Sequence, residues 1–220
     1  EAAKIKELIK ESAEKGNKLV VIIDDAYFGL VYKKGVYTQS IFSELVDLHE
    51  NVLAIKLDGA TKEDYVWGLR VGFVTYGIKG GDKSLYGALE SKIAGAVRGN
   101  ISNDSHLSQS LVYHAFGDSK YLNEKKKKYN LLRKRFKIVN KVFKEHKEYA
   151  DEFTALPYNS GYFMCVRLNN KDGDSVRQIL LDKYDTGVIA IGNILRIAYS
   201  SLKTEVVAEI FENIYKACKE

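Results

Sequence analysis

The chain has 220 residues, of which 45% are hydrophobic and 29% charged, and its formal net charge at pH 7 is +5. This composition is typical of a globular protein with one large domain or two small ones, and 34 basic against 29 acidic residues is too small an excess to favour a nucleic-acid partner. The sequence shows no apolar run of membrane-spanning length and no signal peptide, so no membrane partner is expected.

The cysteines indicate in which cellular compartment the protein is expected, and the first residues indicate whether the chain is part of a longer protein. Cys165 and Cys218 are the only cysteines, and they suggest neither a disulfide framework nor a metal site. A reducing compartment, the cytoplasm, is therefore expected. The chain starts with Glu1 rather than Met, and residues 1–13 already have the pattern of an amphipathic helix without a cap. We expect that the chain begins inside a larger protein.

The first half alternates helical and strand patterns, which is typical of an α/β domain. Helices are predicted at 3–15, at 39–48, from 83 to about 98 after an Asp82 cap, and from Asn103 or Asp104 to Phe116. Strands are predicted at 19–23, 52–57 and 70–78. Because Leu19 to Ile23 is a continuous apolar run, the first strand is expected to be buried on both faces.

The second half has a different order of elements. A long charged helix is predicted at about 119–148, and its basic residues, including the run 125–128, alternate with apolar residues at helical spacing. They are interpreted as the solvated face of an amphipathic helix. The later elements are a strand at 162–168, a helix at 174–183, paired strands at 188–191 and 195–200, and a helix at 204–219 capped by Thr204.

Four residues in the first half form a chemical pattern. Asp24 ends a strand, where open parallel sheets bind ligands, and Tyr27 follows within reach of the same loop. Lys62 precedes Arg70 by eight positions, so an amine for imine formation with an aldehyde cofactor is followed by a guanidinium suited to a phosphate. Each has a simpler interpretation alone. Asp24 can be a turn residue, and such spacings of cations arise by chance.

Taken in order, Asp24-x-Ala26-Tyr27, Lys62, Arg70-x-Gly72 and Arg196 closely resemble the motifs of fold-type I, pyridoxal-phosphate-dependent aminotransferases of classes I and II. The resemblance covers nearly the whole chain and is to the C-terminal part of an aspartate-aminotransferase-like enzyme. It implies an α/β fold in which residues 1–117 complete the large cofactor-binding domain, with a mainly parallel sheet. Residues 118–220 would form the small α+β domain, with 119–148 as the connecting helix.

The resemblance also implies a role for each motif residue. Lys62 would bind the pyridoxal 5'-phosphate covalently and later shuttle the substrate proton. Asp24 would hold the protonated ring nitrogen, Tyr27 the phenolic oxygen and Arg70 the phosphate. Arg196 would bind the α-carboxylate of the substrate through a two-pronged contact.

Two further positions refine or complicate this resemblance. Arg98 begins an Arg-x-Asn-x-Ser-Asn run like the one in which aspartate aminotransferases carry an arginine that reaches across a homodimer to the distal carboxylate of the substrate. This implies dicarboxylic substrates, whereas the alternative is an arginine that only stabilises a helix end. Gly59 stands where the family often has a phosphate-binding serine, and Thr61 is the available substitute.

The function expected from the resemblance is amino-group transfer between an amino acid, aspartate- or glutamate-like, and a 2-oxo acid. The isolated chain is expected to be inactive, because the 23 residues before Asp24 contain no phosphate loop and no aromatic residue to stack on the cofactor. Two alternatives remain open: a pyridoxal-phosphate-dependent lyase or β-decarboxylase, and a non-enzymatic aminotransferase-like sensor domain of a transcription regulator.

Overall fold

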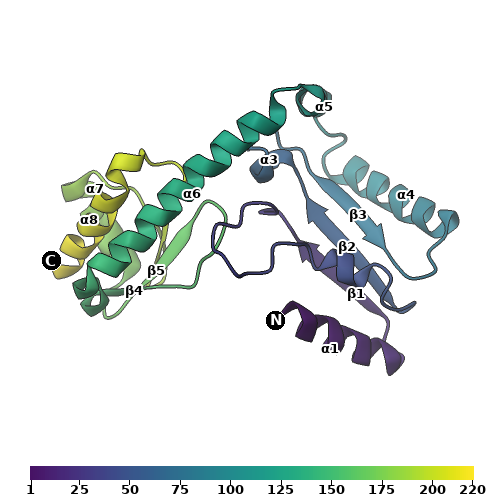
Figure 1. Ribbon diagram of the computed structural model, residues 1–220, viewed down its shortest axis with the longest axis horizontal. Helices are drawn as coiled ribbons and strands as arrows, with labels where there is room; N and C mark the ends of the chain where they lie inside the picture. Colours follow the sequence, from purple (N-terminus) through teal and green to yellow (C-terminus); the bar gives the residue numbers. More distant parts are fainter. The chain divides into compact units, whose positions relative to one another are not determined.

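The computed structural model describes residues 1–220, which divide into two compact units. The first unit comprises residues 1–31 and 35–125, and the second comprises residues 32–34 and 126–220. The division falls inside the long helix α6 (Tyr121–Glu145), which contributes residues to both units. Helices and sheets occur in both units, so the mixed α/β class predicted from the sequence is confirmed (Figure 1).

The first unit is built on a three-stranded sheet in the order β1-β2-β3 (Figure 1). The strands are β1 (Leu19–Asp24), β2 (Val52–Asp58) and β3 (Phe73–Gly77). β1 and β2 are parallel, and β3 is antiparallel to β2. Asp24 is therefore opposite Leu57, and Asp58 is opposite Phe73. The ends of β1 and β2 and the beginning of β3 meet at one edge of the sheet.

Five helices belong wholly to this unit. They are α1 (Ala2–Glu14), α2 (Phe42–Leu45), α3 (Ala60–Glu63), α4 (Lys83–Asn100) and α5 (His106–Gly117). The predicted Asp82 cap is confirmed, because the backbone amide of Leu85 donates to its carboxylate over 2.8 Å. The cap predicted for α5 is wrong: Ser105, rather than Asn103 or Asp104, accepts from the Ser108 amide.

The core of this sheet lies on one face only. Ile23 of β1, Leu45 of α2 and Ala54 of β2 form a buried cluster. On the other side of β1, Val20 and Ile22 are each 63% exposed. The prediction that β1 is buried on both faces is therefore wrong for this chain, because alternate side chains of a strand point to opposite faces and the second face is uncovered here.

The second unit contains a four-stranded antiparallel sheet in the order β4-β5-β7-β6. Its strands are β4 (Phe153–Ala155), β5 (Met164–Leu168), β6 (Ile189–Ile191) and β7 (Ile194–Ile197). Its helical elements, besides most of α6, are η1 (Lys147–Asp151), α7 (Gly173–Tyr184), η2 (Thr204–Val206) and α8 (Val207–Lys219). The expected Thr204 cap is not formed, because α8 begins after Val206, without a side-chain cap.

The apolar face of α6 lies in the core of the second unit. Its buried residues are Leu132, Phe136, Val139 and Val142. Phe143 of α6 meets Phe153 and Phe211 edge-on, with ring centroids 6.2 and 5.1 Å away. These contacts join the helix to the sheet and to α8. No helix of either unit combines the length and apolar character needed to cross a bilayer.

Candidate active site

A cavity of about 230 Å³ opens at the sheet edge where β1 and β2 end and β3 begins. Its walls come from the ends of β1 and β2, from α3 and from the loop that leads into β3. They consist of Asp24, Ala26, Leu57, Asp58, Gly59, Thr61, Lys62, Arg70, Val71 and Gly72. The structure thus brings Asp24, Lys62 and Arg70, three of the residues singled out from the sequence, around one cavity.

Lys62 lies on the single turn of α3, and its side chain is half-buried. Its Nζ atom is 4.2 Å from the centroid of the Tyr27 ring, so the ammonium group lies over an aromatic face. Tyr27 is in the loop that follows β1. The structure therefore brings the fourth predicted residue, Tyr27, against the amine of Lys62.

The turn that holds Lys62 is anchored from two sides. Ala60 packs in a buried cluster with Val71 and with Val112 of α5. Beyond Lys62, Glu63 and Asp64 both bind Lys125, whose Nζ is 2.8 Å from a carboxylate oxygen of each. Tyr121, one turn before Lys125 on α6, donates its hydroxyl to Asp64.

The ion pairs of Lys125 with Glu63 and Asp64 hold the segment that carries Lys62 in place. Burial by itself lowers the pKa of Lys125, but the hydrogen bonds and charges of Asp64 and Glu63 outweigh that effect and raise the pKa above its ordinary value. Lys125 therefore stays charged at neutral pH. This corrects the interpretation of the run 125–128 as uniformly solvated: its other three residues are exposed, whereas Lys125 is half-buried.

The backbone of Arg70 has a conformation that is unusual for a residue with a side chain. Its φ is +56°, in the left-handed region. This conformation costs an L-residue roughly 1–2 kcal/mol. Arg70 is exposed, and its Nη1 reaches only the carbonyl of Trp67, at 3.4 Å. The guanidinium is thus left open to solvent at the cavity wall.

The space around position 59 accounts for glycine there, in place of the serine expected from the resemblance. A Cβ atom at this position would lie 2.5 Å from the carbonyl oxygen of Val71 and 2.7 Å from the Cα of Gly72. Both are backbone atoms, so no rotamer change can relieve the clash. Thr61 donates its hydroxyl to the same Val71 carbonyl over 3.2 Å, which places its oxygen on the cavity wall.

Replacing Gly59 by serine is expected to destabilise the first unit by about 1–3 kcal/mol, because the backbone around Val71 must move. A urea titration of the chain checks this. The control is Gly68→Ser, on the other side of α3, where an added Cβ meets nothing within 4 Å. Its effect should stay within about 0.5 kcal/mol. Equal stability of the two variants would contradict the close approach at Gly59.

Asp24 has both of the properties that the sequence suggested. Its Oδ1 atom accepts a hydrogen bond from the Ala26 amide over 3.1 Å, as a turn residue does. Its side chain is also exposed on the cavity wall at the end of β1. The turn contact fixes the direction of the carboxylate and leaves it accessible to a ligand.

The two remaining predicted residues do not line this cavity. Arg98, near the end of α4, is exposed and donates from Nη1 to Ser102 Oγ over 2.8 Å. Arg196 belongs to β7 in the second unit, is half-buried, and has its guanidinium carbon 3.8 Å from the centroid of the Phe163 ring. Such stacking orients a guanidinium while its N–H groups stay available at the edges.

Three residues that contact predicted site residues or line the cavity were missed in the sequence. Asp58 lines the cavity and forms an ion pair with Lys56, and the signal for it was its place at the end of β2. Lys125 could not be distinguished from its lysine neighbours. Phe163 lies in a predicted strand and was passed over as an ordinary apolar residue.

The sequence matches the family described as "Aminotransferase class I and II" over residues 1–214. No match was found among curated proteins. Solved structures with a similar fold include an aminotransferase from Anaerococcus prevotii, with a TM-score of 0.81 and 24% identity over 100% of this chain and 52% of that one.

Two enzymes of Thermus thermophilus are also similar. The α-aminoadipate aminotransferase LysN, solved with N-(5'-phosphopyridoxyl)-L-leucine, has a TM-score of 0.74 and 21% identity over 97% of this chain and 53% of its own. A double mutant of aspartate aminotransferase has a TM-score of 0.69 and 14% identity over 98% and 52%. The chain spans about half the length of these proteins. The family match over nearly all its length nevertheless shows that the chain belongs to the class I and II aminotransferases, a family that uses pyridoxal phosphate.

Proposed function

We propose that this chain carries the lysine-bearing half of the active site of a pyridoxal-phosphate-dependent aminotransferase. The observation that carries the proposal is the convergence of Asp24, Lys62 and Arg70 on one cavity, with Tyr27 against the lysine amine. The reaction is transfer of an amino group from an amino acid to a 2-oxo acid. Because the chain spans about half of its relatives, the isolated chain is expected to be inactive.

The residues around the cavity fit the cofactor chemically. An anion, an amine and a guanidinium on one wall match a protonated ring nitrogen, an aldehyde and a phosphate. When bound, pyridoxal phosphate supplies an aldehyde for the amino group and a cationic ring that withdraws electrons from the substrate's α-carbon. Residues 1–117 would thus complete the cofactor-binding domain, and residues 118–220 would form the small domain, with 119–148 as the connecting helix.

Each side chain has a distinct task in this proposal. The Asp24 carboxylate keeps the ring nitrogen protonated, and Tyr27 donates its phenol to the ring oxygen. Lys62 would hold the cofactor through its aldehyde carbon, with release of water, and would move the proton at the substrate α-carbon. Arg70, with help from Thr61, holds the phosphate. Arg196, oriented by its stack on Phe163, binds the substrate α-carboxylate.

We further propose dicarboxylic substrates and a homodimer. The support is the Arg-x-Asn-x-Ser-Asn run at Arg98, which resembles the run that reaches across the dimer in aspartate aminotransferases. Arg98 is exposed and oriented by Ser102, as a residue that binds outside its own unit would be. The two free thiols suit a reducing compartment, and we place the enzyme in the cytoplasm.

Arg98→Ala is expected to lower kcat/KM for aspartate or glutamate by about a hundredfold in the complete enzyme, because a buried guanidinium–carboxylate contact is worth a few kcal/mol. Activity with alanine should change little. The assay follows the 2-oxo acid formed from each donor with 2-oxoglutarate. The control is Lys92→Ala, an exposed cation on the same helix. Equal losses for aspartate and alanine, or a wild type that prefers neutral donors, would contradict the role of Arg98.

A further inference from the structure

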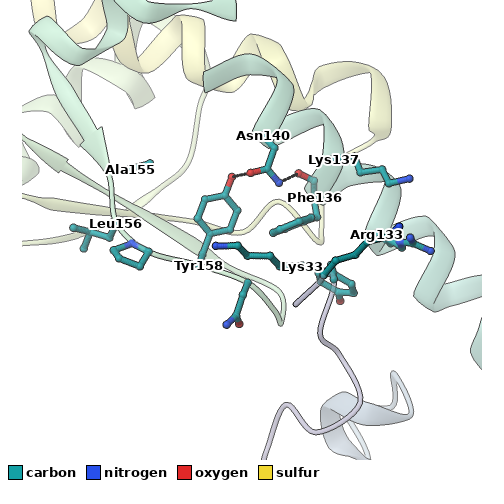
Figure 2. A pocket seen from close by; sticks show the side chains of 12 residues that line it. Lys33, Arg133, Phe136, Lys137, Asn140, Ala155, Leu156 and Tyr158 are labelled. Carbon is teal, nitrogen blue, oxygen red and sulfur yellow. Dashed lines mark hydrogen bonds between the residues drawn. The ribbon is translucent and has the colours of Figure 1, made fainter. Parts of the chain in front are cut away.

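The second unit contains a cavity of its own, of about 780 Å³ (Figure 2). Its walls are one face of α6, the short segment 32–34 and the loop between β4 and β5. The residues that line it are Tyr32, Lys33, Lys34, Arg133, Phe136, Lys137, Asn140, Ala155, Leu156, Pro157, Tyr158 and Asn159. It shares no residue with the cofactor cavity. Its size is in the range of about 300–1,000 Å³ that is usual for small-molecule sites.

The charge of this cavity is of one sign. Four of its residues are cationic, namely Lys33, Lys34, Arg133 and Lys137, and none is acidic. None of the four forms an ion pair within the chain. Elsewhere on α6, Lys125 and Lys141 each have a carboxylate partner. Cations gathered around a hollow without counter-charges favour an anionic ligand with more than one negative charge.

The floor of the cavity is aromatic. Phe136 is in contact with Tyr32 and Tyr158, with ring centroids 5.5 and 5.3 Å away. Tyr32 and Phe136 are buried, so the half-buried Tyr158 presents most of the accessible aromatic surface. Figure 2 shows Phe136 and Tyr158 within the group of side chains that includes Lys33, Arg133 and Lys137. Aromatic side chains beside cations suit a ligand that has a flat ring as well as negative charge, because the ring stacks while the charges pair.

Hydrogen bonds hold these walls in place without a ligand. The amides of Tyr32 and Lys33 donate to the Asn159 carbonyl over 2.9 and 3.3 Å, which fixes segment 32–34 against the β4–β5 loop. The Tyr158 hydroxyl donates to Asn140 Oδ1 over 3.2 Å, and Asn140 Nδ2 donates to the Phe136 carbonyl over 2.9 Å. Burial raises the pKa of Tyr158 to about 12, so its phenol adds no negative charge at neutral pH.

We propose that this cavity is a second ligand site, which binds a nucleoside phosphate, with the base against the aromatic floor and the phosphates among Lys33, Lys34, Arg133 and Lys137. Inorganic phosphate would fill only a small part of the volume and leave the aromatic floor uncovered. An uncharged aromatic ligand would leave four cations without a partner. A nucleoside phosphate satisfies both requirements.

The test is the binding of ADP to the chain by titration calorimetry, without pyridoxal phosphate, because that cofactor also joins a flat ring to a phosphate and would compete for the cavity. We expect one ADP per chain, with binding weakened at least tenfold when the salt concentration is raised from 50 to about 200 mM. Adenosine and inorganic triphosphate should each bind at least tenfold more weakly than ADP, because each retains only half of the recognised chemistry.

Matched variants on one helix locate the site. Arg133→Ala and Lys137→Ala should each weaken ADP binding about tenfold, whereas Lys134→Ala, an exposed cation outside the cavity, should change it less than twofold. Circular dichroism confirms that all three variants are folded. Two results would overturn the proposal: no saturable binding below about 1 mM ADP, or equal effects of all three substitutions.

Discussion

In the complete enzyme, Lys62→Ala is expected to abolish the covalent labelling of the protein by pyridoxal phosphate and borohydride. Lys62 is the only lysine on the wall of the cofactor cavity, and the reagents mark an amine that has joined the cofactor aldehyde. The wild type should incorporate one label per chain, on the peptide that contains Lys62. Mass spectrometry of a digest measures both the amount of label and its position.

The structure supplies two internal checks for this experiment. Lys92→Ala, on the exposed surface of α4, should label like the wild type. Lys56 is the amine that could compete for the label, because it lies on β2, the strand directly before the turn that carries Lys62. Its ion pair with Asp58 and its side-chain exposure of only 16% disfavour imine formation with the cofactor aldehyde. Label on Lys56, or label that persists in Lys62→Ala, would contradict the assignment of Lys62.

The position of the cofactor cavity could be predicted because it depends on local patterns. A strand that ends in Asp24 and another that ends in Asp58 must present both ends at one sheet edge if they are parallel neighbours, as they are. The polar loop with Lys62 follows the second strand directly. The resemblance grouped Asp24 with Lys62, and the direction of the two strands brings both to one cavity in the structure.

The features that were missed depend on contacts between distant parts of the chain. Lys125 resembles the three lysines after it, and only the approach of Glu63 and Asp64, some sixty residues earlier, distinguishes it. Val20 and Ile22 have the same apolar character whether or not a neighbour covers them. The spacing of apolar residues shows which of them lie on the same face of a strand. Whether that face is buried depends on packing against parts of the chain that are distant in sequence.

One helix is shorter than predicted, and serine side chains at its start form hydrogen bonds with nearby backbone groups. The pattern at 39–48 predicted a helix, but α2 covers only Phe42–Leu45. Ser40 accepts a hydrogen bond from the Phe42 amide, and Ser43 donates to the Ser40 carbonyl. Hydroxyl side chains that bind nearby backbone groups in this way compete with helical hydrogen bonds. Apolar spacing alone does not include this competition.

Asp24→Asn is expected to lower kcat of the complete enzyme by about two orders of magnitude or more while leaving the fold nearly unchanged. The amide oxygen can still accept from the Ala26 amide, so the turn after β1 is kept. The negative charge that keeps the ring nitrogen protonated is lost. Removing an ionic hydrogen bond of this kind costs several kcal/mol in the transition state, and every 1.4 kcal/mol is about tenfold in rate.

Comparison of rate with stability separates this role of Asp24 from that of a turn residue. Urea unfolding of Asp24→Asn should stay within about 0.5 kcal/mol of the wild type, because no buried contact changes. Asp47→Asn, which removes an exposed carboxylate in the same unit, should affect neither quantity. If Asp24 were only a turn residue, activity would remain within a few-fold of the wild type. A large loss of rate at unchanged stability is the result expected of a carboxylate that acts on the cofactor ring, because the asparagine keeps the turn and loses only the charge.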